Sequence, residues 1–244
     1  MRNIKLTIEY DGTGYHGWQT QANAVTVQDT LEKCIKKLTG EDCNLIGSSR
    51  TDVGVHALGQ VANFYTNSKI PAEKFSFALN SVLPDDIVIV SSEEAGPDFH
   101  ARFHAKAKRY LYYIYNSTFP SALLRNRAWH VPYSLDISLM ESASTYLKGT
   151  HDFTAFRAAG STTKTSIRTI MDITLVKKQK IIEIDVLGNG FLYNMVRIIA
   201  GTLVEVGRGK ICPDSIPAIL ESRDRSNAGI TAPAHGLYLA QVFY

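Results

Sequence analysis

The order of strand-like and helix-like segments repeats once along the chain, and this constrains the fold more than any other feature. The first half has the order strand, helix, strand, strand, helix, strand, which is typical of ferredoxin-like folds, and the second half repeats it with insertions. The first half has expected strands near 3–10, 43–47, 59–66 and 86–91 and expected helices near 26–39 and 71–82. The second half has expected strands near 108–115, 168–176, 180–187 and 236–243 and expected helices near 136–147, 191–206 and 213–221.

The helix expected near 26–39 illustrates the reasoning. Its apolar residues recur on one face at helical spacing: Val27, Leu31, Ile35 and Leu38. Thr26, with Asp29 three residues later, fits an N-terminal cap, and Gly40 fits a stop. We therefore predict an α+β fold of two ferredoxin-like halves, residues 1–105 and 106–244. If their antiparallel sheets join, a cleft forms between them.

Composition excludes several classes of protein. Apolar residues make up 45% of the 244 residues and charged residues 20%, which is ordinary for a globular chain and not for a disordered one. No apolar run approaches the length of a membrane span, and the N-terminus has no apolar signal region. The 3 cysteines form no CxxC pair, so a disulfide framework is not expected. We predict a cytoplasmic protein without a membrane segment.

Positive charge gathers in one window although the net charge is only +3. Between Asp98 and Asp136 there is no acidic residue. The window contains Arg102, Lys106, Lys108, Arg109, Arg125 and Arg127, interleaved with aromatic residues. Basic groups neutralise phosphates and aromatic rings stack on bases, so the window favours nucleic-acid contact. A solvated basic face is the structural alternative.

Two other patterns are weak. Gly12-Thr-Gly-Tyr-His-Gly17 matches GxGxxG, but no helix opens at the last glycine, so a glycine-rich turn is more probable than a dinucleotide site. His100 and His104 are four residues apart, yet no helix is expected there and no HExxH motif exists. We expect structural or RNA-contacting histidines rather than a metal site.

The segment 48–57 joins two expected strands and is long and polar for a hairpin. Asp52 lies two residues before Gly54, so one interpretation is an Asx-turn with Gly54 at positive φ. The other is a carboxylate presented at a strand end, its ionised form favoured by an arginine. A single ionised carboxylate suits covalent catalysis or proton abstraction. The local sequence leaves both interpretations open.

The whole pattern resembles a known family. Ser49-Arg50-Thr51-Asp52-Val53-Gly54-Val55-His56-Ala57 closely resembles the nucleophile loop of the tRNA pseudouridine synthases of the TruA family. Further matching segments follow in order along the chain: 10–12 with 17–19, 99–102, 108–112, 149–156, 190–197, 232–233 and 236–239. Any one match is weak or moderate, whereas the ordered set is very specific. Ser49 departs from the family, which usually has glycine before the arginine.

The resemblance implies isomerisation of uridine to pseudouridine at positions 38, 39 and 40 of the tRNA anticodon stem-loop. It implies a homodimer that needs no cofactor and no metal, with two ferredoxin-like halves joined over a central basic cleft. Asp52 then matches the catalytic aspartate, Tyr110 the tyrosine that stacks on the target base, and Arg197 the arginine that pairs with the carboxylate.

We also expect a set of residues to contact RNA. Arg50 matches the arginine thought to assist base flipping. The other expected contacts are His56, Arg102, Lys108, Arg109, Arg125, Arg127, Lys164 and Arg168. Two alternatives remain: a non-catalytic RNA-binding protein with two RRM-like halves, and a metal-dependent RNA-processing hydrolase. The absence of an RNP1 pattern argues against the first, and the absence of clustered ligands against the second.

Overall fold

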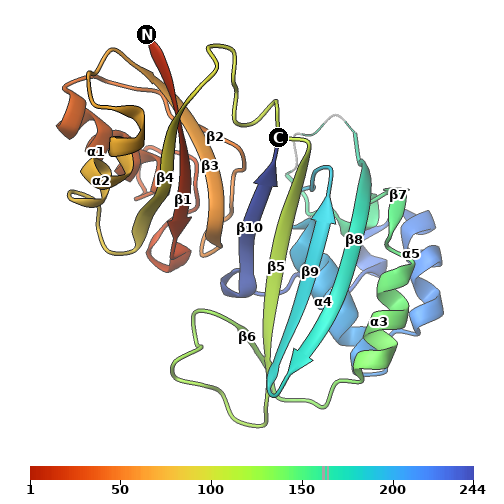
Figure 1. Ribbon diagram of the computed structural model, residues 1–244. Helices are drawn as coiled ribbons and strands as arrows, with labels where there is room; N and C mark the ends of the chain where they lie inside the picture. Colours follow the sequence, from red (N-terminus) through yellow and green to blue (C-terminus); the bar gives the residue numbers. More distant parts are fainter. Residues whose placement is uncertain (161–162, 164) are drawn as a thin grey trace. The chain divides into compact units, whose positions relative to one another are not determined.

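The computed structural model describes residues 1–160, 163 and 165–244, which form a mixed α+β protein (Figure 1). The chain divides into two compact units, which are described separately below. Unit 1 comprises Met1–Lys106 together with Tyr238–Tyr244, and unit 2 comprises Ala107–Leu237. Most of the closing strand thus packs with unit 1, whereas the sequence-based division grouped it with the second half.

Unit 1 is built around β1 (Arg2–Tyr10), which pairs antiparallel with both β3 (His56–Thr66) and β4 (Ile87–Ala95). The short β2 (Ile46–Gly47) is antiparallel to β3, and β10 (Leu237–Phe243) runs parallel to it. Alternate residues of β1 point into the core, where Ile4, Leu6 and Ile8 are fully buried. Helices α1 (Val27–Thr39) and α2 (Phe75–Asn80) cover this sheet (Figure 1).

Unit 2 has the strand order β5 (Ala107–Asn116), β9 (Ile181–Gly188), β8 (Ile167–Lys178) and β7 (Gly149–Asp152), with antiparallel neighbours. The short β6 (Trp129–Val131) adds to β5 in parallel. Helices α3 (Ile137–Thr145), α4 (Met195–Gly207) and α5 (Ile216–Ser222) lie on one side of the strands (Figure 1). Eleven of the residues of α4 are buried, so this helix forms the centre of the core.

The structure bears out the expected α1 closely. The Thr26 hydroxyl accepts a hydrogen bond from the Asp29 backbone N–H, and Gly40 ends the helix in the left-handed conformation. α4 begins at Met195 rather than near 191, because Asn194 has a φ of 60° that interrupts helical geometry. Strands β6 and β7 were not expected, and β2 is shorter than the sequence suggested. Among the residues that the structure describes, no helix is long and apolar enough to cross a membrane.

Candidate functional site

The loop that carries Asp52 joins β2 to β3 in unit 1, and its first part is fixed to β3 by one buried side chain. Gln60 accepts hydrogen bonds through Oε1 from the Ser48 hydroxyl (2.6 Å) and the Ser49 N–H (3.2 Å). Its Nε2 donates to the Ser49 carbonyl oxygen at 2.8 Å. Ser48, Ser49 and Gln60 are all buried. The backbone that leads into Asp52 is therefore rigid, because a buried amide that satisfies several polar groups is costly to displace.

Two glycines of the Gly12–Gly17 segment let the chain approach the same loop closely. A Cβ at Gly12 would overlap the Val55 carbonyl oxygen. At Gly17, where φ is +83°, a Cβ would lie 2.6 Å from the Thr51 carbonyl oxygen. The next residue, Trp18, donates its backbone N–H to that oxygen at 3.0 Å. The glycine-rich motif thus serves close backbone contact with the Asp52 loop, and not a dinucleotide.

The far side of the loop is held as firmly. The Thr51 and Tyr10 hydroxyls share a 2.7 Å hydrogen bond. Gly54 has a φ of 75°, as expected, and the Val55 N–H donates to the Asp52 carbonyl oxygen at 3.1 Å, so the turn is closed by a backbone hydrogen bond. Asp52 is half-buried, whereas Arg50 is exposed. The turn interpretation and the presented carboxylate are therefore compatible.

His56 follows this loop in the chain, as the first residue of β3. It is 1% exposed, and its ring stacks on Tyr238 with centroids 4.6 Å apart. Its Nδ1 accepts a hydrogen bond from the Gly12 N–H at 3.1 Å. A ring buried in this way reaches RNA only if the surrounding segment moves, and its observed contacts are with Gly12 and Tyr238.

Tyr110 lies on β5 of unit 2, in register with Val186 of β9. Phe191 meets it edge to face, with ring centroids 5.1 Å apart. An edge contact of this kind orients one aromatic ring by another. The Tyr110 ring is half-buried.

Arg197, on the first turn of α4, is held from two directions. Its Nε donates to the Ala232 carbonyl oxygen and its Nη1 donates to Asn194 Oδ1, both at 2.7 Å. The Ala232 N–H in turn donates to the Arg197 carbonyl oxygen at 3.1 Å. These contacts limit the rotamers of a long side chain before any substrate binds.

The segment that accepts a hydrogen bond from Arg197 also accepts one from Tyr112. The Tyr112 hydroxyl donates to the Pro233 carbonyl oxygen at 2.8 Å, and a Cβ at Gly236 would lie 2.9 Å from that hydroxyl oxygen. Burial raises the pKa of Tyr112 well above its ordinary value, although the nearby Arg197 charge acts in the opposite direction. Tyr112 is thus a neutral structural donor.

The remaining residues expected to contact RNA are distributed over both units. Arg50 and Arg102 in unit 1 and Arg125 and Arg127 in unit 2 are exposed, and Lys108 is half-buried. Arg109 is half-buried, with its Nε 3.4 Å from Asp185 Oδ1. Lys164 lies outside the described residues.

Arg168 on β8 is the most constrained of this set. Its Nη1 donates to the backbone carbonyl oxygens of Thr165 at 3.0 Å and Ile167 at 2.6 Å. Partial burial lowers its pKa. Gly190 lies beside it, with the position of a Cβ 3.6 Å from Arg168 Nε.

His100 and His104 use ring nitrogens for local structure. His100 Nδ1 accepts hydrogen bonds from the N–H groups of Arg102 and Phe103, both at 3.2 Å. His104 Nδ1 accepts from the His100 N–H at 3.4 Å. Within the described part of the chain, no group of three or more His, Cys, Asp or Glu residues is placed to hold a metal ion.

The comparison with known proteins gives one consistent result. A family model described as tRNA pseudouridine synthase matches residues 6–104 and 143–244. A protein of Acetivibrio thermocellus named tRNA pseudouridine synthase A is 65% identical over 244 residues, covering 100% of both chains. A protein of Thermoanaerobacter sp. with the same name is 59% identical, also over 100% of both chains.

A solved structure, of the archaeal box H/ACA sRNP Nop10–Cbf5 complex, is more distant. It matches 82% of this chain and 43% of that chain, with a TM-score of 0.39 and 9% identity.

Sequence reasoning missed the residues that hold the expected catalytic groups. Gln60 and Tyr10 fix the Asp52 loop, and Asn194 and Ala232 fix Arg197. Asn194 and Ala232 fall inside segments that resemble the family, but nothing in those patterns indicated a contact with Arg197. The sequence-based prediction of an Asp52–Arg197 ion pair joins residues of different units and stays a prediction.

Proposed function

The chain belongs to the tRNA pseudouridine synthase family, whose members are isomerases, and we propose that it acts on uridines 38, 39 and 40 of the anticodon stem-loop. The observation that carries the proposal is the rigid placement of Asp52 in a chain that matches named tRNA pseudouridine synthases over its full length. The position of the target uridines rests on the resemblance of the catalytic loop to that of the TruA family.

The reaction places narrow demands on the protein. The N1–C1′ bond of uridine breaks, the uracil turns, and a C5–C1′ bond forms, while C5 loses its proton and N1 gains one. No water is consumed, so the site must exclude it during the reaction. We propose that the ionised Asp52 initiates the exchange, as nucleophile or as base. The contacts that fix its loop support this role, because catalysis by one carboxylate needs accurate positioning.

We assign Tyr110 and Arg197 to the reacting base and to the carboxylate. Tyr110 would stack on the flipped uracil and take part in the late proton transfer, and its edge contact with Phe191 supports an oriented ring. Arg197 would pair with Asp52 and hold it ionised near neutral pH. The Ala232 carbonyl oxygen and the Asn194 side-chain amide oxygen accept hydrogen bonds from Arg197, which supports a guanidinium that is oriented before substrate binds.

A base inside a stem must leave its stack before it can react, at a cost of a few kcal/mol. The exposed Arg50, two residues from Asp52, suits filling the vacated space. We propose that the phosphates are held by Arg102, Lys108, Arg109, Arg125, Arg127, Lys164 and Arg168. For His56 we favour a supporting role beneath the loop, since its ring is buried.

The finer architecture is also a proposal. We infer that each half is ferredoxin-like and that the sheets join around a basic cleft, with the halves at 1–105 and 106–244. The order β4-β1-β3 with β2 antiparallel to β3 supports this for the first half, and the order β5-β9-β8 supports it for the second. We further propose a homodimer, which sedimentation tests, in the cytoplasm, where tRNA is modified.

Tritium release tests the function directly. A tRNA transcript labelled with tritium at uridine C5 loses label only if C5 forms the new glycosidic bond. Transcripts that keep a single uridine at 38, 39 or 40, with cytidine at the other two positions, separate the three targets. Release from each of the three supports the full proposal. Binding without release would favour the RNA-binding alternative, and strand cleavage would favour the hydrolase.

A further inference from the structure

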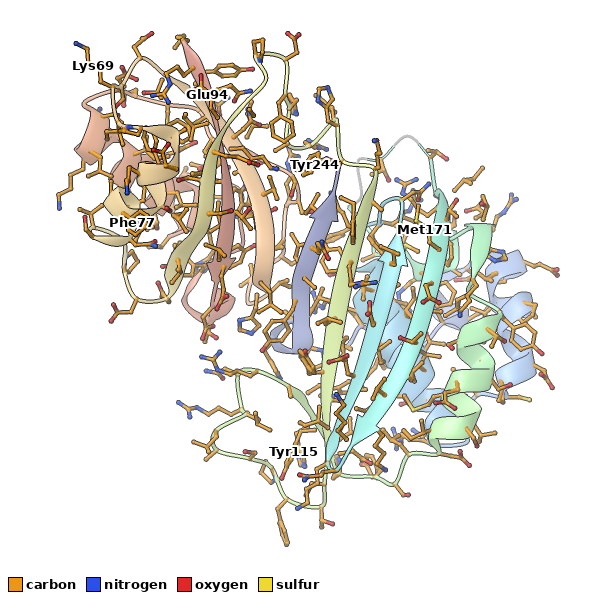
Figure 2. All side chains as sticks on the ribbon, viewed as in Figure 1. Lys69, Phe77, Glu94, Tyr115, Met171 and Tyr244 are labelled. Atoms are coloured by element: carbon orange, nitrogen blue, oxygen red, sulfur yellow. The ribbon has the colours of Figure 1, made fainter. Side chains whose placement is uncertain are left out.

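A small cavity in unit 2 is not used by the mechanism above. It has a volume of about 250 Å³ and lies where β5 ends beside β6. Its lining includes aromatic rings and one cation, from Tyr115, Trp129, His130, His235 and Arg125, together with small and aliphatic residues such as Ala128 and Leu124. Figure 2 labels Tyr115 at this end of β5. The volume lies below the ~300–1000 Å³ typical of sites for whole small molecules, so it suits one planar ring system.

The rings of the cavity are fixed in place. His130 shares a 2.7 Å hydrogen bond with the Ser117 carbonyl oxygen, and its ring centroid lies 6.1 Å from that of Tyr115. Trp129 meets the buried Tyr112 edge to face at 6.3 Å. The Leu124 carbonyl oxygen accepts hydrogen bonds from the Arg127 and Ala128 N–H groups, which orders the loop that forms the outer wall. A preformed slot of this kind loses little entropy when a flat ligand enters.

Positive charge lies at the cavity and at the neighbouring strand ends. Arg125 and Arg127 lie on the β5–β6 loop, Lys177 and Lys178 end β8, and Lys180 lies on the β8–β9 turn; all five are exposed. The Asn116 N–H donates to the Lys180 carbonyl oxygen at 2.7 Å, so the turn lies next to the end of β5. Figure 1 shows the loop and the turn at the same end of unit 2. The nearest acidic residue along β9 is Glu183, paired with Tyr113. An anionic chain carrying flat rings fits this surface.

One short segment connects the cavity to the proposed site. The Ala232 carbonyl oxygen accepts a hydrogen bond from Arg197, and the Pro233 carbonyl oxygen accepts one from Tyr112. His235, two residues further along the chain, lines the cavity. Tyr115 lies five residues after Tyr110 on β5, so the two rings project from opposite faces of the same strand.

We propose that this cavity binds one unpaired nucleobase of the tRNA substrate. The base lies against the rings that line the cavity while Arg125 and the nearby cations hold the flanking phosphates. The inference rests on the proposed function, because it takes the RNA bound at Tyr110 as the source of the base.

Filling the cavity tests the proposal. Leu124→Trp places an indole in it, while Leu123→Trp puts the same group on the neighbouring residue, which is 87% exposed and does not line the cavity. We expect Leu124→Trp to weaken tRNA binding about tenfold or more, with Leu123→Trp unchanged, because stacking of one base contributes on that scale. Single-turnover tritium release at saturating tRNA should stay close to that of the unmodified enzyme.

A cycle with altered RNA identifies the base. Ligated tRNAs carry one abasic nucleotide at each unpaired position of the anticodon loop in turn. At one position, the abasic nucleotide should weaken binding to the unmodified enzyme as much as Leu124→Trp weakens binding of the intact tRNA. Combining that abasic tRNA with Leu124→Trp should cause no further loss of affinity. Additive losses at every position, or equal binding by Leu124→Trp and Leu123→Trp, would overturn the proposal. So would a change in oligomeric state with unchanged tRNA binding, which would mark the cavity as a protein contact.

Cross-linking gives an answer even if Leu124→Trp fails to fold. With 5-bromouridine at the same loop positions, irradiation of the unmodified complex should join one position to a peptide containing Tyr115 or Trp129. The absence of such a peptide at every position contradicts the proposal. Failure of the proposed function is distinct, because the unmodified enzyme would then release no tritium from any transcript.

Discussion

Arg197 donates from Nη1 to Asn194 Oδ1 at 2.7 Å, and Asn194 holds a left-handed backbone conformation with φ at 60°. One residue thus starts α4 and orients the guanidinium that emerges from its first turn. The conformation suits asparagine and glycine and is strained for other residues. Local chain geometry and the position of a proposed catalytic group therefore depend on the same side chain.

Two substitutions separate these roles of Asn194. Asn194→Gly keeps the backbone conformation and removes the acceptor, whereas Asn194→Ala removes the acceptor and adds strain. We expect both to lower kcat by about tenfold to a hundredfold, since a hydrogen bond to a charged group contributes roughly 1.5–3 kcal/mol. Only Asn194→Ala should also lose about 1 kcal/mol of unfolding free energy relative to Asn194→Gly. Full activity in Asn194→Gly would show that this contact does not position Arg197 for the reaction.

Gly17 is predicted to be essential for the shape of the Asp52 loop. A methyl group at Gly17 would lie 2.6 Å from the Thr51 carbonyl oxygen, at a φ of +83°. We expect Gly17→Ala to cost about 2 kcal/mol of unfolding free energy or more, and to reduce turnover by displacing Asp52. Gly14→Ala is the matched control, because nothing lies within 4 Å of its Cβ position. Denaturant titration and tritium release of both variants give the comparison. Equal stability and equal activity of the two variants would show that the close approach at Gly17 does not shape the Asp52 loop.

Tyr110 should contribute in two separable ways. Tyr110→Phe keeps the ring, so substrate binding should change little while the late step of a single-turnover reaction slows. Tyr110→Ala also loses the stacking surface, which contributes about 1–3 kcal/mol per base. Tyr146→Phe is the control, because the Tyr146 hydroxyl that it removes donates only to Asp214 on the surface among the contacts seen for it. If Tyr110→Phe reacts at the normal rate, the hydroxyl has no part in proton transfer.

The exposed arginines of the β5–β6 loop should appear in the salt dependence of binding. Each lost phosphate contact reduces the slope of log K against log salt by about 0.7–0.9. Arg125→Ala combined with Arg127→Ala should therefore reduce the slope by up to about 1.8 and weaken binding at low salt. Lys33→Ala with Lys69→Ala, two exposed positions outside the basic window, should leave the slope unchanged. An equal slope in both double variants would exclude the β5–β6 loop from the RNA surface.

Periodic features of the fold were predictable from the sequence. The spacing of Val27, Leu31 and Ile35 gave α1, and all three are buried. The spacing says nothing of a single residue with unusual backbone geometry, so the start of α4 was placed too early. β7 was missed because its four residues Gly149–Asp152 have no alternating apolar pattern and are paired by β8.

The candidate site was predictable only as separate motifs. Asp52, Tyr110 and Arg197 stand out through the resemblance of their segments to a family. The residues that hold them do not, because contacts such as Gln60 with Ser49 or Arg197 with Ala232 join positions 11 and 35 residues apart. Such contacts depend on tertiary packing, which no local pattern encodes.

The central claim is that the carboxylate of Asp52 carries out the isomerisation. Asp52→Asn keeps the size of the side chain and removes its charge, and Asp42→Asn, an exposed carboxylate paired with Lys36, is the matched control. The decisive measurement is tritium release from C5-labelled tRNA by both variants, alongside their affinity for the same tRNA. We predict that Asp52→Asn releases no tritium but binds the tRNA with an affinity within about tenfold of that of the unmodified enzyme, or roughly 1.4 kcal/mol. Asp42→Asn should keep full activity. Pseudouridine formed by pure Asp52→Asn would contradict the account.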